Sequence, residues 1–221
     1  MLSRRQWLQA TLGALGTFSG SKVLGAICGV TPAQGEGPYY PERDLNRDND
    51  LVHFGARAAL GERIVLTGTV MDTACKPLAG ALVEIWQAAA SGKYNHTEDP
   101  NALPLDPNFQ YWGRALTDTA GQYRFDTIIP GHYPLTPRLV GVPPTGPGQY
   151  RPPHIHFKVH ARGFRSLTTQ MYFDPKSYDD ADLAKTVSDL NRWENVDANL
   201  VVHFGVVGTE RRGVFDITLR A

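Results

Sequence analysis

Two histidines separated by a single residue are the first feature of this sequence that could do chemistry. His154 and His156 stand in the run Arg151-Pro152-Pro153-His154-Ile155-His156-Phe157. Successive side chains of an extended strand alternate between its two faces, so the two imidazoles share one face. The prolines stiffen the approach, because residues before proline favour extended backbone. The pattern predicts a pair of metal ligands, although a solvated strand face can show the same alternation.

Two tyrosines at glycine-bearing turns are candidate partners for these histidines. Tyr94 follows the run Ser91-Gly92-Lys93, and Tyr133 stands in Pro130-Gly131-His132-Tyr133-Pro134. A phenol with a pKa near 10 is a poor ligand at neutral pH. A strongly acidic cation changes this, because it can hold the phenol as phenolate. Two phenolates with two imidazoles suit ferric iron better than zinc or copper.

The segments that must position these residues read as short strands joined by turns. Strands are expected at residues 63–71, 80–87, 112–118, 122–129, 154–158, 166–173, 199–207 and 213–219. One helix is expected at residues 178–191, and residues 95–111 and 135–149 are long proline-bearing loops. About eight strands with one helix predict a mainly β fold, a single β-sandwich domain over residues 31–221.

Charge limits the partners that this chain can have. Its 22 basic and 22 acidic residues cancel, so no excess charge favours nucleic acid or an anionic membrane surface. We therefore expect small-molecule partners and further copies of the chain in a homo-oligomer.

Residues 1–30 are expected to be a signal peptide of the twin-arginine type. The run Ser3-Arg4-Arg5-Gln6-Trp7-Leu8-Gln9 precedes a mildly apolar segment at residues 10–18, which is too short to span a bilayer. The alternative is an N-terminal helix that belongs to the fold. The first interpretation predicts a protein that crosses the membrane folded and works in the periplasm.

The chain contains two cysteines, Cys28 and Cys75. A leader cut beyond Cys28 would leave only one, so no internal disulfide is expected to hold the fold. Cys75 lies in the turn at residues 72–77 and is expected to be a small, partly buried structural thiol.

Three motifs of this chain occur together in one family of enzymes. They are Gly-Lys-Tyr94 after a Trp-Gln strand end, Gly121-x-Tyr-x-Phe-x-Thr-Ile-x-Pro-Gly-x-Tyr133-Pro, and Arg151-Pro-x-His154-Ile-His156-Phe. As a set they resemble the intradiol ring-cleavage dioxygenases, nearest to the protocatechuate 3,4-dioxygenase type. The resemblance covers residues 34–219, and the set is specific although each motif alone is weak.

The resemblance implies a non-haem Fe(III) centre that cleaves a catecholic ring between its two hydroxyl-bearing carbons. Both atoms of O2 would enter a cis,cis-muconate-type product, in the catabolism of an aromatic compound. Tyr133 would leave the ion as the catechol binds, and Arg151 would stabilise negative charge on the ring, so these two are the expected catalytic residues. The metal ligands implied are Tyr94, Tyr133, His154 and His156, with a solvent hydroxide.

The resemblance also implies residues of the substrate pocket. Gln170 matches a glutamine that lines the pocket in the family. Gly37, Pro38 and Tyr39 match a substrate-binding segment, which this chain or a neighbouring copy could supply. Leu135 stands where the protocatechuate enzymes have tryptophan, so recognition of a carboxylated catechol is not implied.

Two other functions fit parts of this pattern. A non-catalytic β-sandwich module that binds iron or catecholate ligands would keep the four ligands without turnover. A zinc hydrolase would use His154 and His156, but lacks a third ligand of the usual kind. We expect the other histidines at surface, loop or structural positions, with His96 near the rim of the pocket: His53, His96, His132, His160 and His203.

Overall fold

The structure is a computed structural model that describes residues 27–42 and 48–221. These residues form twelve strands, one α-helix and three 3-10 turns. The strands are β1 (Arg63–Asp72), β2 (Leu82–Gln87), β3 (Trp112–Leu116), β4 (Gln122–Ile128), β5 (Tyr133–Pro134), β6 (Tyr150–Arg151), β7 (His154–His160), β8 (Leu167–Phe173), β9 (Val201–Val202), β10 (Gly205–Val207), β11 (Glu210–Val214) and β12 (Ile217–Leu219). The helix is α1 (Ala181–Trp193), and the turns are η1 (Pro137–Leu139), η2 (Pro175–Ser177) and η3 (Ala198–Leu200).

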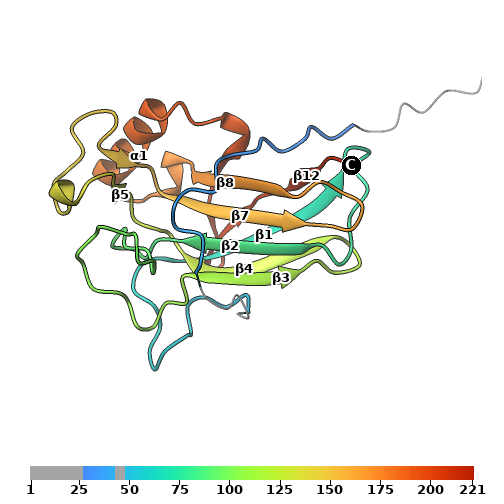
Figure 1. Ribbon diagram of the computed structural model, residues 1–221, viewed down its shortest axis with the longest axis horizontal. Coiled ribbons are helices and arrows are strands. Elements are labelled where there is room, and N and C mark those ends of the chain that lie inside the picture. The colour runs from blue at the N-terminus through green and yellow to red at the C-terminus, as the bar shows by residue number, and fades with distance from the viewer. Residues whose placement is uncertain (1–26, 43–47) are drawn as a thin grey trace, which may run out of the picture.

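Two five-stranded sheets form the body of the domain (Figure 1). One sheet has the order β10-β11-β1-β12, with β4 also paired to β1, and the other has the order β3-β2-β7-β8-β9. Strand β1 pairs with β4 antiparallel and with β11 and β12 in parallel. The two-stranded ribbon β5-β6 and helix α1 lie at one end of the sheets. The predicted mainly β sandwich is confirmed.

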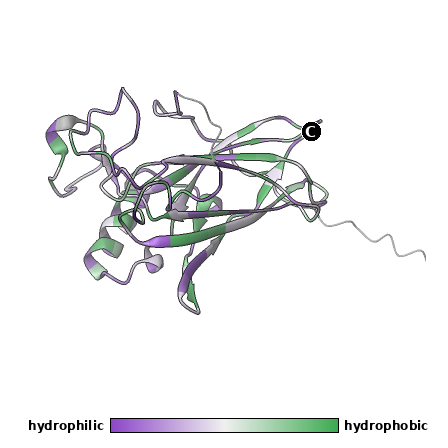
Figure 2. Cartoon of the chain, turned by 90° about the horizontal axis from the view of Figure 1, so that it is seen from below, coloured by the Kyte–Doolittle hydropathy of each residue, from purple (hydrophilic) through white to green (hydrophobic). Residues whose placement is uncertain are grey.

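Aromatic side chains fill the space between the two sheets. Ile155 and Phe157 of β7 are fully buried. The Phe157 ring centroid lies 6.2 Å from that of Tyr123 in β4 and 5.0 Å from that of Phe215, next to β11. Hydrophobic residues run along the strands in Figure 2. Because Ile155 and Phe157 face this core, strand alternation turns His154 and His156 to the outer face of their sheet.

Helix α1 begins and ends slightly later than the sequence predicts. Asp180 caps it, because the Asp180 carboxylate accepts a hydrogen bond from Leu183 N at 2.8 Å. Residues 175–177, just ahead of it, form η2 instead. Val187 and Leu190 are the buried residues of the helix, so it packs on the domain by one narrow stripe.

Two strands expected near the C-terminus are each broken. Residues 199–207 form η3, β9 and β10, and Phe204 N between the strands donates to Ser177 Oγ at 2.9 Å. Residues 213–219 are divided between β11 and β12, and Phe215 N at the break donates to a carbonyl of β1 at 2.8 Å. These breaks depend on partners far away along the chain, which a local pattern does not contain.

Residues 27–42 form an extended segment, here called the N-terminal strap. Figure 1 shows it in blue, running past β8 before it turns across the ends of β7 and β2. Thr31 N donates to Thr218 O in β12 at 3.2 Å, and Gln34 N donates to Thr168 O in β8 at 2.9 Å. The strap therefore belongs to the folded domain, and it leads to the outer face of β7.

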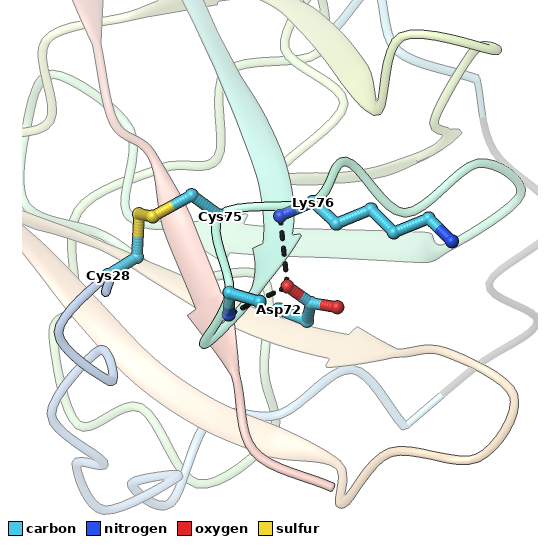
Figure 3. Close-up of a disulfide and its surroundings, with 5 residues drawn as sticks. Cys28, Asp72, Cys75 and Lys76 are labelled. Carbon is cyan, nitrogen blue, oxygen red and sulfur yellow. Dashed lines mark hydrogen bonds between the residues drawn. A yellow bond between two sulfur atoms is a disulfide. The ribbon is translucent and has the colours of Figure 1, made fainter. Parts of the chain in front are cut away.

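A disulfide joins the strap to the turn after β1 (Figure 3). Cys28 and Cys75 are bonded with their Cα atoms 5.3 Å apart, an ordinary separation. Asp72 shapes the turn, because its Oδ1 accepts hydrogen bonds from the backbone N of Ala74 and Lys76, both at 2.9 Å. The expectations of no internal disulfide and of a free thiol at Cys75 are therefore wrong. They assumed a leader cleaved beyond Cys28, whereas Cys28 lies in the strap.

Most of the expected signal peptide, residues 1–26, lies outside the residues that the structure describes. The twin-arginine pattern at residues 3–9 and the apolar run at residues 10–18 both fall there. Within the described ranges, no helix has the length and apolar character needed to cross a membrane.

Candidate metal centre

Tyr94, Tyr133, His154 and His156 lie together on the outer face of the sheet that contains β7. The Nε2 atoms of His154 and His156 are 3.0 Å apart, and the Tyr94 hydroxyl lies 3.3 Å from His154 Nε2. The Tyr133 ring centroid is 5.4 Å from that of Tyr94 and 5.7 Å from that of His154. Tyr94 comes from the loop after β2, Tyr133 from β5 and the histidines from β7. The structure thus brings the predicted ligand residues to one place.

Both imidazoles are neutral, and their Nε2 atoms face each other. The Nδ1 atom of His154 donates to Pro152 O at 2.7 Å, which leaves Nε2 as the unprotonated nitrogen. Burial, with a smaller effect of the Arg151 charge, lowers the pKa of His154 to about 3. Burial also lowers the pKa of His156 well below its usual value. Two nitrogens so close need a proton or a metal ion between them, because their lone pairs otherwise repel.

The two phenols are protonated when no cation is present. Burial is the main cause that raises the pKa of Tyr94 well above 10 and also raises that of Tyr133. The charge of Arg151 acts in the opposite direction on both. The backbone of Tyr94 is fixed by Asp99, whose Oδ2 accepts a hydrogen bond from Tyr94 N at 2.6 Å. A highly charged cation between these oxygens would favour the phenolates.

His156 is held by packing rather than by a hydrogen bond. Its Nδ1 is buried and has no hydrogen-bond partner among the described residues. Trp86 stacks on it, with ring centroids 4.6 Å apart and planes within 8° of parallel. Gly37 of the strap also touches the ring, because a Cβ at residue 37 would lie 3.3 Å from His156 Cε1. The two imidazoles are therefore fixed by different means.

Arg151, in β6, is fixed beside the ligand residues by contacts from three directions. Its Nη2 donates to Gln170 Oε1 at 2.9 Å and to the Tyr172 hydroxyl at 3.1 Å. Glu194, directly after α1, places Oε1 2.8 Å from Arg151 Nε but off the N–H direction, so this contact is an ion pair. Gln170 Nε2 in turn donates to Gly35 O of the strap at 2.7 Å. Arg151 and Gln170 thus form one wall of the site.

The strap of the same chain supplies Gly37, Pro38 and Tyr39 to the site. The Tyr39 ring centroid lies 4.7 Å from that of Tyr94 and 5.8 Å from that of Tyr133. Gly37 and Pro38 are exposed. A neighbouring copy is therefore not needed to bring this segment to the ligand residues.

Four histidines expected at the surface or at the rim lie outside the ligand set. His53, His160 and His203 have side chains that are 52%, 41% and 52% exposed. His96 is more buried, with a side chain 8% exposed, and its ring centroid lies 5.6 Å from that of Tyr39. It stands at the rim of the site, as the sequence predicts.

A groove of about 650 Å³ lies beside the β5-β6 ribbon and apart from the ligand residues. Its lining includes His132, Pro134 and Tyr150, the chain neighbours of Tyr133 and Arg151. Strand alternation turns these two sets of side chains to opposite faces of the ribbon. The ribbon therefore separates the groove from the candidate metal centre.

Sequence reasoning assigned no role to three side chains that shape the site. Trp86 pairs in register with His156, and Tyr172 pairs with His154, so both lie on the outer face beside the histidines. The third is Glu194. Alternation within β2 and β8 would have placed the two aromatic residues once the strand order was known, whereas no sequence signal pointed to Glu194.

The donor set fits ferric iron better than zinc. Within residues 27–42 and 48–221, no group of three or more His, Cys, Asp or Glu side chains could hold a metal ion. A metal at this position therefore has to take tyrosine ligands. Structural and catalytic zinc sites use His, Cys and carboxylates, while hard phenolate oxygens with imidazoles suit Fe(III). The zinc hydrolase suggested by the His-x-His pair does not fit.

Comparison with known proteins relates most of this chain to dioxygenases. Residues 35–220 match the dioxygenase family. The chain is 46% identical over 140 residues to the protocatechuate 3,4-dioxygenase beta chain of Burkholderia cepacia, which covers 62% of this chain and 56% of that protein. It is 37% identical over 172 residues to the catechol 1,2-dioxygenase of Acinetobacter baylyi, and this match covers 72% of this chain and 52% of that protein. The chain thus spans about half the length of the curated relatives it matches.

Solved structures share the fold. The dioxygenase domain of a dioxygenase carbohydrate-binding protein fusion from Streptomyces sp. SirexAA-E aligns with a TM-score of 0.62 at 28% identity, over 87% of this chain and 99% of that one. An intradiol ring-cleavage dioxygenase from Tetranychus urticae has the same fold, with a TM-score of 0.60 at 24% identity over 87% and 95% of the two chains. The match over residues 35–220 and the named relatives show that this chain belongs to the intradiol dioxygenase family.

Proposed function

We propose that this protein is a non-haem Fe(III) dioxygenase that uses O2 to cleave a catecholic ring between its two hydroxyl-bearing carbons, giving a cis,cis-muconate-type product. The observation that carries the proposal is the convergence of two phenols and two neutral imidazoles, with the histidine Nε2 atoms 3.0 Å apart. Relatives named protocatechuate 3,4-dioxygenase and catechol 1,2-dioxygenase support it. The residues proposed to hold the ion are Tyr94, Tyr133, His154 and His156.

The protein would hold these donors in place before the ion arrives. Pro152 O fixes one imidazole, Trp86 stacks on the other, and Asp99 fixes the backbone of Tyr94. Iron(III) would supply the Lewis acidity that binds a catechol as its dianion and makes the ring reactive toward O2. Preorganised ligands of this kind spare the cost of rearrangement when the substrate binds.

Tyr133 and Arg151 are the proposed catalytic residues. They are partners in the β5-β6 register, and Arg151 lowers the pKa of Tyr133 against the larger, opposite effect of burial. When the bound ion holds Tyr133 as a phenolate, its oxygen would be suited to accept a proton from an incoming catechol hydroxyl. The Arg151 guanidinium stays protonated and would stabilise negative charge on the ring, while Gln170 keeps it in position.

The strap and Gln170 are proposed to shape the substrate pocket. Tyr39 packs against both tyrosine ligands, so it limits the access of water to the reacting ring. Gly37 has φ of +74° and lies against His156, a close approach that glycine permits. Pro38 fixes the backbone between them.

Oxygen uptake by the iron-loaded protein tests this function. With catechol, protocatechuate and hydroxyquinol as candidates, we expect one O2 consumed per ring and both atoms of ¹⁸O2 in the product. Tyr94→Phe and His154→Ala should lose iron and the tyrosinate-to-iron absorption, whereas Tyr111→Phe, at a buried tyrosine outside the ligand set, should keep both. A coloured catechol complex without oxygen uptake would favour a binding module. Colourless protein after iron loading would contradict both functions.

We also propose that the protein is exported by the twin-arginine route and works in the periplasm. The Arg4-Arg5 pattern supports this, and so does the Cys28–Cys75 disulfide, since disulfides persist in oxidising compartments. Cleavage would then precede Cys28, earlier than the boundary at residue 30 that the sequence alone suggested. N-terminal sequencing of the exported protein tests this, and a first residue beyond Cys28 would contradict it.

A homo-oligomer is a further part of the proposal. Leu103, Val142 and Leu183 are 40%, 45% and 38% exposed, and all three line the groove beside the β5-β6 ribbon. Apolar surface gathered in this way is typical of subunit contacts. Light scattering should give a mass above that of one chain, and a monomer at high protein concentration would refute the proposal.

A further inference from the structure

Arg151 already has an anionic partner within the chain. Glu194 Oε1 lies 2.8 Å from Arg151 Nε, and the two side chains are only 29% and 20% exposed. Glu194 is the C-cap residue of α1, where the partial negative charge of the helix end disfavours a carboxylate. The local helix preference therefore argues against glutamate here, and the ion pair with Arg151 is the contact that compensates for it.

The other contacts of Arg151 are uncharged. Its Nη2 donates to Gln170 and Tyr172, and its register partner is Tyr133. A largely buried guanidinium needs a counter-charge, because desolvation of an unpaired charge is costly. In a pocket built for an acidic ring, the substrate can supply that counter-charge. In this chain Glu194 supplies it before any substrate is bound.

We propose that Glu194 is a specificity-determining residue, which makes the site select catechols whose ring carries no anionic substituent. The proposal rests on the proposed function and deepens it. A carboxylated ring would have to compete with Glu194 for Arg151 and would meet a like charge nearby. Repulsion of this kind is a common source of discrimination between similar ligands. The substrate class that fits is an uncharged catechol.

Catechol and protocatechuate form the test pair, because they differ by one ring carboxylate. For the wild type, kcat/KM should favour catechol by about tenfold or more, which lies between the effect of one like-charge contact in bulk water and the larger effect near a protein surface. Glu194→Gln should reduce this ratio about tenfold by improving the protocatechuate value. Glu194→Asp keeps the charge and should keep the preference. Anaerobic Kd values for both rings, from the change in iron absorption, should show the same ratios without turnover.

A matched control separates this effect from a general loss of charge. Asp189→Asn removes a carboxylate from the same helix, but Asp189 pairs with Lys185 and Arg192, so it should leave the ratio unchanged. Iron content is measured for each variant, so that misfolded protein is recognised. If Glu194→Gln does not fold, Glu194→Asp is compared with the wild type instead, and a changed ratio of kcat/KM in that variant overturns the proposal. A wild type that prefers protocatechuate overturns the proposal. If Glu194→Gln changes kcat/KM equally for catechol and for protocatechuate, the proposal is also overturned, because Glu194 would then only position Arg151.

The outcome also separates this inference from the function on which it rests. If iron-loaded wild type consumes no oxygen with catechol, protocatechuate or hydroxyquinol, the proposed dioxygenase function is wrong. The anaerobic affinities still decide the charge preference in that case. If oxygen is consumed but the ratio of the two kcat/KM values does not change in Glu194→Gln, the function stands and the specificity role of Glu194 is refuted.

Discussion

The loss of the disulfide is a perturbation whose size can be worked out from the structure. The Cys28–Cys75 bond has a sequence separation of 47. In the chain-entropy account, a crosslink of that span lowers the entropy of the denatured chain by about 14 cal/mol/K, which is about 4 kcal/mol at 25 °C. Measured values are often smaller, so the double variant Cys28→Ser, Cys75→Ser should lose about 2–4 kcal/mol of unfolding free energy.

The loss should fall on stability and spare the metal centre. Between Cys28 and Gly37, the strap makes five hydrogen bonds of its own with β8 and β12. These contacts do not involve sulfur and remain when the bond is cut. The strap should therefore still place Gly37 and Tyr39 beside the ligand residues.

Urea and thermal unfolding of the wild type and the double variant measure the effect. At about 2–4 °C per kcal/mol for a chain of this size, Tm should fall by about 4–16 °C. Reductant should lower the Tm of the wild type to that of the variant and leave the Tm of the variant unchanged. A wild-type Tm that does not change with reductant refutes the loop-closure reasoning. A variant that folds but no longer retains iron refutes the independence of the strap contacts.

Three further predictions concern the metal centre. Gly37→Ala should lower the free energy of unfolding by about 1 kcal/mol or more and weaken iron retention. The reason is that φ of Gly37 is +74° and the added methyl would lie 3.3 Å from His156 Cε1. Gly35→Ala is the control and should have neither effect, because nothing lies within 4 Å of the added methyl. Trp86→Leu should lower the iron content of the purified protein by removing the ring stacked on His156, and Trp86→Phe should restore most of it; equal iron content in all three proteins would count against the stacking argument. Burial lowers the pKa of His154 to about 3, whereas the pKa of histidine in the unfolded chain is about 6.5. Between about pH 3 and pH 6.5, the metal-free folded state therefore binds fewer protons than the unfolded state. Its stability should fall as the pH drops from 6.5 towards 3, with a slope of up to about 1.4 kcal/mol per pH unit for each such histidine; urea unfolding of the metal-free protein should show a shallower slope in His154→Gln, and identical slopes would refute this reasoning.

Strand alternation was sufficient to predict the histidine pair, because the signal is local. Residues 154–160 are extended throughout, so His154 and His156 share a face whatever the strand pairs with. The sandwich itself follows from the same period of two along several segments. The choice of Tyr94 and Tyr133 needed more, since each lies in or beside a turn, and the family motifs supplied it.

The contacts around Arg151 could not be predicted, because they join segments that are distant in the chain. Glu194 reaches Arg151 only because the end of α1 packs over the β5-β6 end of the sheets. Tyr172 depends on the pairing of β7 with β8. A helix end and a strand pairing of this kind are set by tertiary packing, which neither periodicity nor spacing contains.

The disulfide was missed for a different reason, a boundary misplaced by a few residues. Ending the leader at residue 30 removed Cys28 from the domain, and Cys75 then had no partner. The local reading of residues 72–77 as a turn was right, since Asp72 Oδ1 accepts backbone hydrogen bonds within it. The error therefore lay in where the fold begins and not in the character of the turn.

The disulfide and the metal centre lie near opposite ends of the strap, which bears on the order of events in the proposed export route. A twin-arginine substrate crosses the membrane folded, so iron would bind while Cys28 and Cys75 are still thiols in a reducing compartment. That order requires a strap that can place Gly37 and Tyr39 without the sulfur bond, and its hydrogen bonds to β8 and β12 meet this requirement. Protein from a reducing cytoplasm should therefore carry its iron, and later oxidation should raise Tm without changing the iron absorption. Reduced protein that cannot hold iron would contradict loading before export.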